Sequence, residues 1–206
     1  MVRNSLSQAR VDKPSDPWLN MALAGKYATQ WTPSRSGRAQ SRYELRVIQQ
    51  PEFAAETLVG PYGLPIVPAP MVEVIRLIDG REVDLAPEEA MRLVLTPHVM
   101  RGGFDNEPLE DVTEQGLRFE PTNVILDGNH WLFVFGDCGI RNVGRYSLRF
   151  SLWPMENGAP ALAQVTTQTF PVVETGEWPL HERWFTPLSA RIAEEHPRLH
   201  IYRPRF

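Results

Sequence analysis

Three arginines close together in the sequence are the residues whose type and spacing best suggest chemistry. Arg141, Arg145 and Arg149 lie in a turn and along the alternating segment that follows it. Because side chains alternate along a strand, Arg145 and Arg149 should share one face. A guanidinium offers planar, paired donors that suit phosphate or guanine. Local sequence alone favours the alternative, in which these arginines pair with nearby carboxylates such as Asp137 or Glu156.

The residues that usually carry catalysis or bind metals are poorly placed for either role. Cys138 is the one cysteine, and His130 lies too far along the same expected strand to act as its base. His196 and His200 have no cysteine pair before them, as a zinc site of that spacing would need. The acidic run 105–114 lacks the spacing of a calcium loop and is expected to be a solvated loop. The sequence therefore gives only weak signals for an enzyme and indicates no catalytic residue and no metal site.

Composition indicates a folded protein of ordinary size. The 206 residues are 42% hydrophobic and 22% charged, and a single cysteine excludes an intrachain disulfide. We find no apolar run of membrane-spanning length and no signal-peptide pattern, so we expect an intracellular protein without a membrane partner or small-molecule substrate. Residues 1–46 carry eight basic and three acidic residues, whereas the remainder has a net charge of −9. An acidic body argues against a broad nucleic-acid face but not against a local basic patch.

The chain divides into an expected flexible basic N-terminal arm, residues 1–42, and a domain over residues 43–206. Alternating or apolar segments separated by turn signals predict an all-β fold, a β-sandwich. The expected strands cover 43–50, 71–78, 91–100, 123–127, 130–137, 145–153 and 161–173. A short C-terminal helix should begin at Thr186 as N-cap with Pro187 in its first turn, and 199–202 could rejoin a sheet.

These segments together resemble the velvet-domain family of fungal regulators. YELRVIQQP (43–51) looks like the opening strand of the family, and PIVPAPMVEV (65–74) like its Pro-rich run. The most specific similarity is WLFVFGDCGIRNVGRYSLRFSLW (131–153), with its Phe-x-Asp end, turn arginine and Arg-Tyr-x-Leu-x-Phe. TPLSARIAEE (186–195) and LHIYR (199–203) resemble the closing helix and last strand.

The resemblance implies an immunoglobulin-like β-sandwich related to Rel-type DNA-binding domains. It implies a regulator of development, sporulation and secondary metabolism. It also implies homodimers or heterodimers with other velvet-type subunits, located in the nucleus, and no enzyme activity or cofactor. The DNA-binding candidates are then Arg42, Arg46, Arg141, Arg145 and Arg149, helped by the basic arm. Since the chain shows no dense basic cluster, we expect it in both nucleus and cytoplasm, with a partner assisting import.

One loop departs from the family pattern. Arginines are expected in the loop Glu52–Pro65, but Phe53 and Ala55 stand near those positions, and Glu52 and Glu56 make the loop acidic. Each lost phosphate contact should weaken DNA binding and flatten its dependence on salt. This departure motivates a second hypothesis, a velvet-like dimerisation partner or scaffold without direct DNA binding.

A third hypothesis lies outside the family. A β-sandwich module for a small ligand or glycan could use Trp178 and Trp184 to stack on a sugar. That hypothesis requires exposed indole rings lining a deep pocket.

Overall fold

The computed structural model of the chain describes residues 41–57, 65–102, 108–118, 123–156, 158–178 and 182–203. All of them belong to one compact unit, Ala39–Phe206. Of the expected arm, only residues 41 and 42 are described, and they begin the first strand. None of the helices in these ranges has the length and apolar character needed to cross a membrane.

One sheet, called the first sheet, runs in the order β1-β3-β9-β8, with β4 also paired to β3. All of its pairings are antiparallel. Its strands are β1 (Ser41–Gln49), β3 (Met71–Ile78), β4 (Arg81–Val83), β8 (Asn123–Asp127) and β9 (His130–Val134). Turns at Asp79-Gly80 and Gly128-Asn129 connect the β3–β4 and β8–β9 hairpins, as the sequence predicts.

The second sheet runs in the order β2-β13-β11-β5-β6, with β12 also paired to β11. Its long centre is the antiparallel pair of β11 and β5. Its strands are β2 (Ala54–Ala55), β5 (Leu93–Arg101), β6 (Glu110–Asp111), β11 (Gly144–Pro154), β12 (Ala163–Thr166) and β13 (Phe170–Val173). A separate small ladder joins β7 (Leu117–Arg118) to β10 (Gly139–Ile140).

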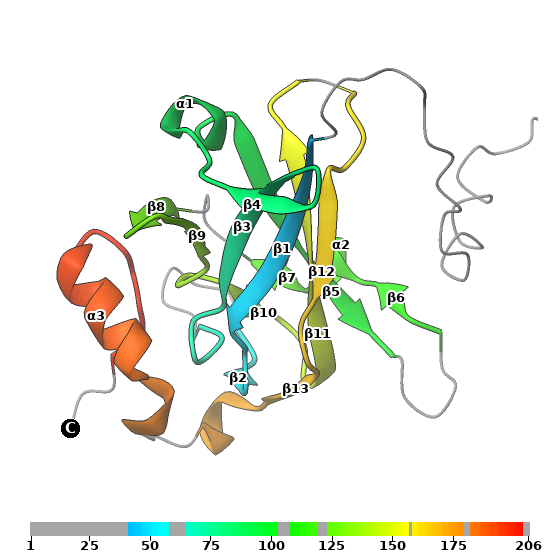
Figure 1. Cartoon of the computed structure of the whole chain (residues 1–206). Coiled ribbons are helices and arrows are strands. Elements are labelled where there is room, and N and C mark those ends of the chain that lie inside the picture. The colour runs from blue at the N-terminus through cyan, green and yellow to red at the C-terminus, as the bar shows by residue number, and fades with distance from the viewer. Residues whose placement is uncertain are drawn as a thin grey trace, which may run out of the picture. The chain divides into compact units, whose positions relative to one another are not determined.

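The two sheets enclose one apolar core, and α3 (Pro187–Glu195) creates a second on the outer face of the first sheet (Figure 1). Alternation on β11 places Tyr146, Leu148, Phe150 and Leu152 in the main core. In the second core, Ile192 of α3 packs with residues of β3, β8 and β9. The short helices are α1 (Pro87–Ala90), α2 (Thr113–Gly116), and the 3₁₀ turns η2 (Thr175–Glu177) and η3 (Glu182–Trp184).

The expected all-β sandwich with a short C-terminal helix is confirmed. The Thr186 hydroxyl accepts a hydrogen bond from the Ser189 amide at 3.0 Å and caps α3, with Pro187 in the first turn, as predicted. Three details differ from the expectation. Residues 161–173 form two strands, because β12 and β13 pair with different halves of β11. Residues 199–202 form no strand, and the acidic loop ends in the short edge strand β6.

Candidate functional site

Arg145 and Arg149 share the outer face of β11, as the sequence predicts. The residues between and beside them, such as Tyr146 and Leu148, point into the main core. Arg145 is exposed and lies opposite Pro171 of β13. Arg149 is half-buried and lies between His98 of β5 and Thr166 of β12. The strand thus presents two guanidinium groups on the side of the second sheet that faces away from the core.

Arg149 does not pair with the carboxylates expected from local sequence. Its Nη2 lies 2.8 Å from the sulfur of Met100, and its Nε is buried without a hydrogen-bond partner among the described groups. The positive charge of Arg149 instead acts on the carboxylate of Asp111, on β6. Burial alone would raise the pKa of Asp111, but hydrogen bonds from Thr113 and the charges of His98 and Arg149 lower it.

Arg101 is another arginine at this end of the second sheet, but it lies on the other face. It ends β5 directly opposite Tyr146, and directly opposite residues of paired strands share a face, so its side chain leaves the sheet on the side of Tyr146 and not on the outer face of Arg145. Its Nη2 lies 2.7 Å from Oε2 of Glu110, and both side chains are more than half exposed. The register of β5 against β11 therefore separates Arg101 from Arg145 and Arg149.

Arg141 completes the group at this end of the second sheet. It is exposed in the turn that follows β10, three residues before β11 begins. We call Arg141, Arg145 and Arg149 the arginine group. Their donors suit phosphate oxygens, which several guanidinium groups can contact together.

Arg42 and Arg46 lie elsewhere, on the outer face of the first sheet. Arg42 pairs with Glu44 on the same strand at 2.9 Å. Arg46 reaches Glu73 of β3 at 3.2 Å and Glu82 of β4 at 3.4 Å. The structure therefore does not join these two arginines with the arginine group, because the two outer faces point away from each other across the core.

Glu73 is the unusual member of this second set. Its side chain is only 7% exposed, yet both oxygens have cationic or polar neighbours. Oε2 faces Arg46, and Oε1 lies 2.5 Å from Nδ1 of His130. A buried carboxylate without such partners would strongly destabilise the fold. The role of Arg46 is therefore structural, because it neutralises the buried carboxylate of Glu73.

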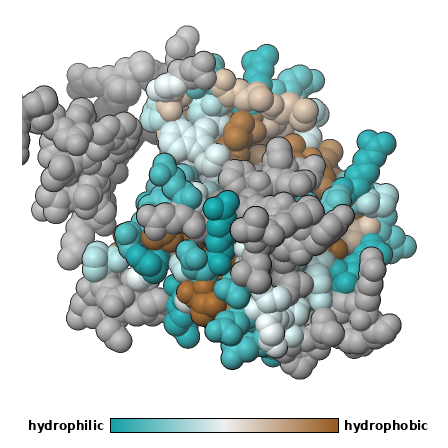
Figure 2. Space-filling view, turned by 180° about the vertical axis from the view of Figure 1, so that it is seen from behind, coloured by the Kyte–Doolittle hydropathy of each residue, from teal (hydrophilic) through white to brown (hydrophobic). Residues whose placement is uncertain are grey.

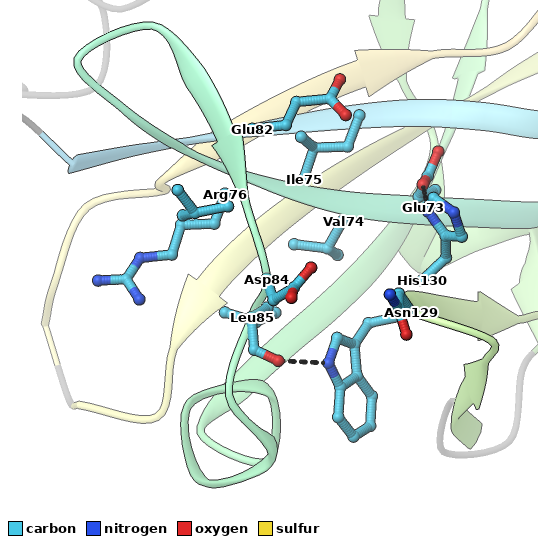
Figure 3. Close-up of a pocket in the computed structure, with 11 residues that line it drawn as sticks. Glu73, Val74, Ile75, Arg76, Glu82, Asp84, Leu85, Asn129 and His130 are labelled. Carbon is cyan, nitrogen blue, oxygen red and sulfur yellow. Dashed lines mark hydrogen bonds and ion pairs between the residues drawn. The ribbon is translucent and has the colours of Figure 1, made fainter.

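A pocket of about 220 Å³ opens beside Glu73, between β3, β4 and the start of β9 (Figure 3). Glu82, Asp84 and His130 line it together with Glu73, and the figure shows His130 turned toward Glu73. The Trp131 indole closes one wall by donating to the Leu85 carbonyl at 2.8 Å. Glu73 is already paired with Arg46 and His130. Its buried carboxylate is therefore not left unpaired for a ligand in this pocket.

The loop that departs from the family pattern is held by aromatic packing. Residues 58–64 of that loop lie outside the described residues. Phe53 stacks on Trp184 with ring centroids 5.1 Å apart and meets Trp178 edge-on at 5.8 Å. Trp184 is 1% exposed, so it cannot stack on a sugar as the glycan hypothesis requires. Phe53 therefore anchors this loop to the η2–η3 segment.

The Gln49-Gln50 pair at the end of the first strand has a structural role. The Gln49 amide nitrogen donates to the Ala69 carbonyl at 2.6 Å and to the Ser189 hydroxyl at 2.9 Å. Its oxygen accepts from the Thr186 hydroxyl at 2.5 Å. Gln50 accepts from the Gln168 amide at 3.0 Å. Gln49 thus joins β1, the Pro-rich run and the beginning of α3.

Cys138 has the inert environment expected from the sequence. It is 1% exposed within the main core. Burial, together with the nearby Asp137 carboxylate, raises the pKa of its thiol to about 12. A thiol in this state is a poor nucleophile at neutral pH.

Comparison with known proteins agrees with the resemblance found in the sequence. Residues 110–204 match the model of the Velvet family, described as velvet factor. No curated protein matches the chain. The matched region includes β11, with Arg145 and Arg149, and extends through α3. Together with the sandwich and its C-terminal helix, this match over residues 110–204 supports a velvet-domain protein.

Proposed function

We propose that this velvet-domain protein is a dimeric transcriptional regulator that contacts DNA through the arginine group. The observation that carries the proposal is the alignment of Arg145 and Arg149 on one outer face, with Arg141 exposed in the turn before β11. Such a group can neutralise several phosphates of one backbone. Following the family, we place its action in the nucleus, reached with a partner, and in the control of fungal development, sporulation and secondary metabolism.

This proposal narrows the set of candidate residues. Arg42 and Arg46 are engaged by Glu44, Glu73 and Glu82 on the first sheet, so we assign them to the stability of that sheet. DNA contact then falls to the end of the second sheet where Arg141 precedes β11. Loops and strand ends of a rigid sandwich are the usual place for such contacts.

The test is binding to random-sequence duplex DNA across a salt series. Arg145→Ala should weaken binding about threefold to tenfold and reduce the salt slope by about one unit. Arg42→Ala is the matched control, because it removes the same charge from an exposed strand position on the other sheet. Equal binding by the wild type and both variants would refute the assignment of DNA contact to this face.

For the dimer, exposed apolar residues at the opposite end of the second sheet are the best candidates. Val94 lies opposite Trp153, and the Leu162 amide bonds to the neighbouring Leu152 carbonyl at 2.7 Å. Val94, Leu162 and Met155 are 38%, 37% and 68% exposed. Seen from behind, the molecule shows several separate apolar patches among hydrophilic side chains (Figure 2). Subunit interfaces usually centre on such apolar residues.

Sedimentation of Val94→Glu/Leu162→Glu tests this location. If a velvet-type subunit packs there, the variant should sediment as a monomer at concentrations where the wild type, or its mixture with a partner subunit, is a dimer. Leu126→Glu is the control, since Leu126 is 48% exposed on β8 of the other sheet. A variant that still dimerises would place the interface elsewhere.

The second candidate function is a dimer partner that does not hold DNA itself. It is favoured by exposed Glu52, Glu174 and Glu177 near the departing loop, and by the Arg101–Glu110 pair. In that case the purified chain should bind no duplex at low salt, while a mixed dimer with a basic velvet-type subunit should bind. Tight binding by the chain alone would exclude this function.

A further inference from the structure

The strand β8 forms one edge of the first sheet. Within the described ranges it pairs with β9 alone, and the two-residue turn between these strands makes Asp127 and His130 a hydrogen-bonded pair. Because hydrogen-bonded pairs alternate along an antiparallel ladder, Val124 and Leu126 direct their backbone N–H and C=O groups away from β9. No backbone bond from the described part of the chain reaches these outward groups. β8 therefore presents unpaired donors and acceptors at the edge of the sheet.

The opposite edge of this sheet is protected in ways that β8 is not. β1 carries the charged side chains of Arg42, Glu44 and Arg46, and its pairing with β3 shifts register between Val47 and Gln49. Charges and irregular pairing are usual devices that keep an edge strand from pairing with another chain. β8 has the sequence NVILD, with an apolar centre and neither lysine nor proline. An open edge of this composition favours the addition of a further extended strand.

A groove of about 340 Å³ lies along this edge, between β8 and the segment that follows α3. Val124 and Ile125 both line it. Consecutive residues of a strand point to opposite faces, so a groove that touches both residues borders the edge itself. Pro197 and Leu199 line it from the other side, and Figure 1 shows β8 at the side of the sheet near the end of α3. The groove can therefore receive the side chains of a strand added to β8.

The far wall of the groove is held in place from β8. Arg191 of α3 binds the two oxygens of Asp127 at 2.7 and 2.8 Å and reaches Glu195 at 3.3 Å. Both carboxylates near the groove are thereby paired. Arg198 is an exposed residue of the lining, and no carboxylate of the described residues lies within ion-pair distance of it. A preformed groove with this unpaired arginine favours an occupant that brings an acidic side chain.

We propose that the edge of β8 is a docking site for an extended peptide segment of a partner protein, in which apolar and acidic residues alternate. The segment adds to β8 as a further strand and bonds to the outward groups of Val124 and Leu126. Its apolar side chains continue the face of Val124, which packs against the main core. Its acidic side chains follow the face of Ile125 and meet Arg198. This surface is separate from the arginine group and lets the protein recruit a partner without DNA.

The test uses a fluorescent nine-residue peptide in which valine and glutamate alternate, titrated with the full chain and followed by anisotropy. Arg198→Glu should weaken binding at least about tenfold, because it sets like charges against each other. Leu126→Pro should also weaken binding about tenfold, because proline removes the outward N–H while the bonds to β9 remain. Leu126→Ala is the matched control, since it keeps that N–H and should weaken binding less than about threefold.

Further controls separate strand pairing from charge. Arg42→Glu reverses the same charge on the opposite edge strand and should change binding less than about twofold. General attraction does not explain binding of an acidic peptide, because the chain itself has a net charge of −4. In an added strand only alternate amides face β8, so N-methylation of one alternate set should abolish binding and N-methylation of the other should not. This comparison also tests the pairing if thermal unfolding shows that Leu126→Pro does not fold.

The outcomes either support or overturn the docking site. No anisotropy change up to about 1 mM protein, or equal binding by the wild type, Arg198→Glu and Leu126→Pro, would refute it. Equal binding of the two N-methylated peptides would refute strand addition. If the chain alone sediments as a dimer that Leu126→Pro dissociates and Arg42→Glu does not, a second copy fills the edge and the proposed partner peptide is wrong.

Discussion

On β1 of the first sheet, Arg42 and Arg46 stand four residues apart, as Arg145 and Arg149 do on β11 of the second sheet. The neighbouring strands make the difference. On the first sheet, β3 supplies the buried carboxylate of Glu73 to Arg46. On the second, β5 supplies the sulfur of Met100 to Arg149. A guanidinium paired with a buried carboxylate stabilises the fold, whereas contact with a thioether does not neutralise Arg149, and the nearby Asp111 carboxylate offsets its charge only in part.

The outer faces of the two sheets also differ in what covers them. α3 and the segment after it pack on the first sheet, where Ile192 and Ile201 meet β3, β8 and β9. In the described residues, no comparable apolar cluster lies on the outer face of the second sheet. The first face is thus specialised for internal packing, and the second is the face on which we place function.

The largest effect is expected where the C-terminal segment touches the first sheet. A Cβ at Gly136 would lie 1.9 Å from the His200 carbonyl oxygen, so Gly136→Ala must displace backbone. We expect it to lower the free energy of unfolding by about 3 kcal/mol. Urea denaturation measures this. Gly176→Ala is the control, because its Cβ would meet nothing within 4 Å, and equal stability of the two variants would contradict the prediction.

A smaller loss is expected at the beginning of α3. Gln49→Ala removes two donated hydrogen bonds and one accepted bond, and leaves the Ala69 carbonyl buried without its partner. We expect a cost of about 2 kcal/mol in the free energy of unfolding. Gln50→Ala, which loses one bond to the Gln168 amide, should cost less than about 1 kcal/mol. If both variants unfold at the same urea concentration, Gln49 does not hold α3.

The two arginine faces are compared directly by Arg46→Ala and Arg145→Ala. Arg46→Ala leaves Glu73 with His130 alone and should destabilise the protein by about 1–2 kcal/mol without changing DNA binding. Arg145→Ala should leave stability within about 0.5 kcal/mol and weaken DNA binding instead. Thermal unfolding and the salt series are run on both variants. The comparison between the faces fails if Arg46→Ala weakens DNA binding as much as Arg145→Ala.

The smallest effect concerns the pH dependence at β6. The pKa of Asp111 is lowered in the folded state by Thr113, His98 and Arg149, against the opposing effect of burial. Its stabilising contribution is therefore present above the usual aspartate pKa of about 3.9 and is lost as the pH falls through the lower folded value. Because the carboxylate is 47% exposed, the contribution should stay below about 1 kcal/mol.

Asp111→Asn should accordingly be slightly less stable than the wild type at neutral pH, with the difference closing in acid. Unfolding by urea at several pH values measures it, and Glu88→Gln serves as the exposed control. A difference that grows on acidification would have the wrong sign and would contradict this assignment.

The sequence was most informative where local chemistry decides structure. Alternation along 145–153 placed Arg145 and Arg149 on one outer face, and Thr186 with Pro187 predicted the beginning of α3. It was least informative where two distant segments meet. The expectation that Arg149 pairs with a nearby carboxylate was wrong, because strand register brings Asp111 and Met100 to it instead.

By itself, the sequence determined the all-β class, the C-terminal helix and the two faces of β11, because periodicity and capping act over a few residues. The tertiary structure alone decided which neighbours each arginine meets. Pairing of β1 with β3 gives Arg46 to Glu73, and pairing of β5 with both β11 and β6 brings Met100 and Asp111 to Arg149 and Glu110 to Arg101. The physical reason is that the charge available at a surface depends on the nearest opposite charge in space, which only strand register can supply.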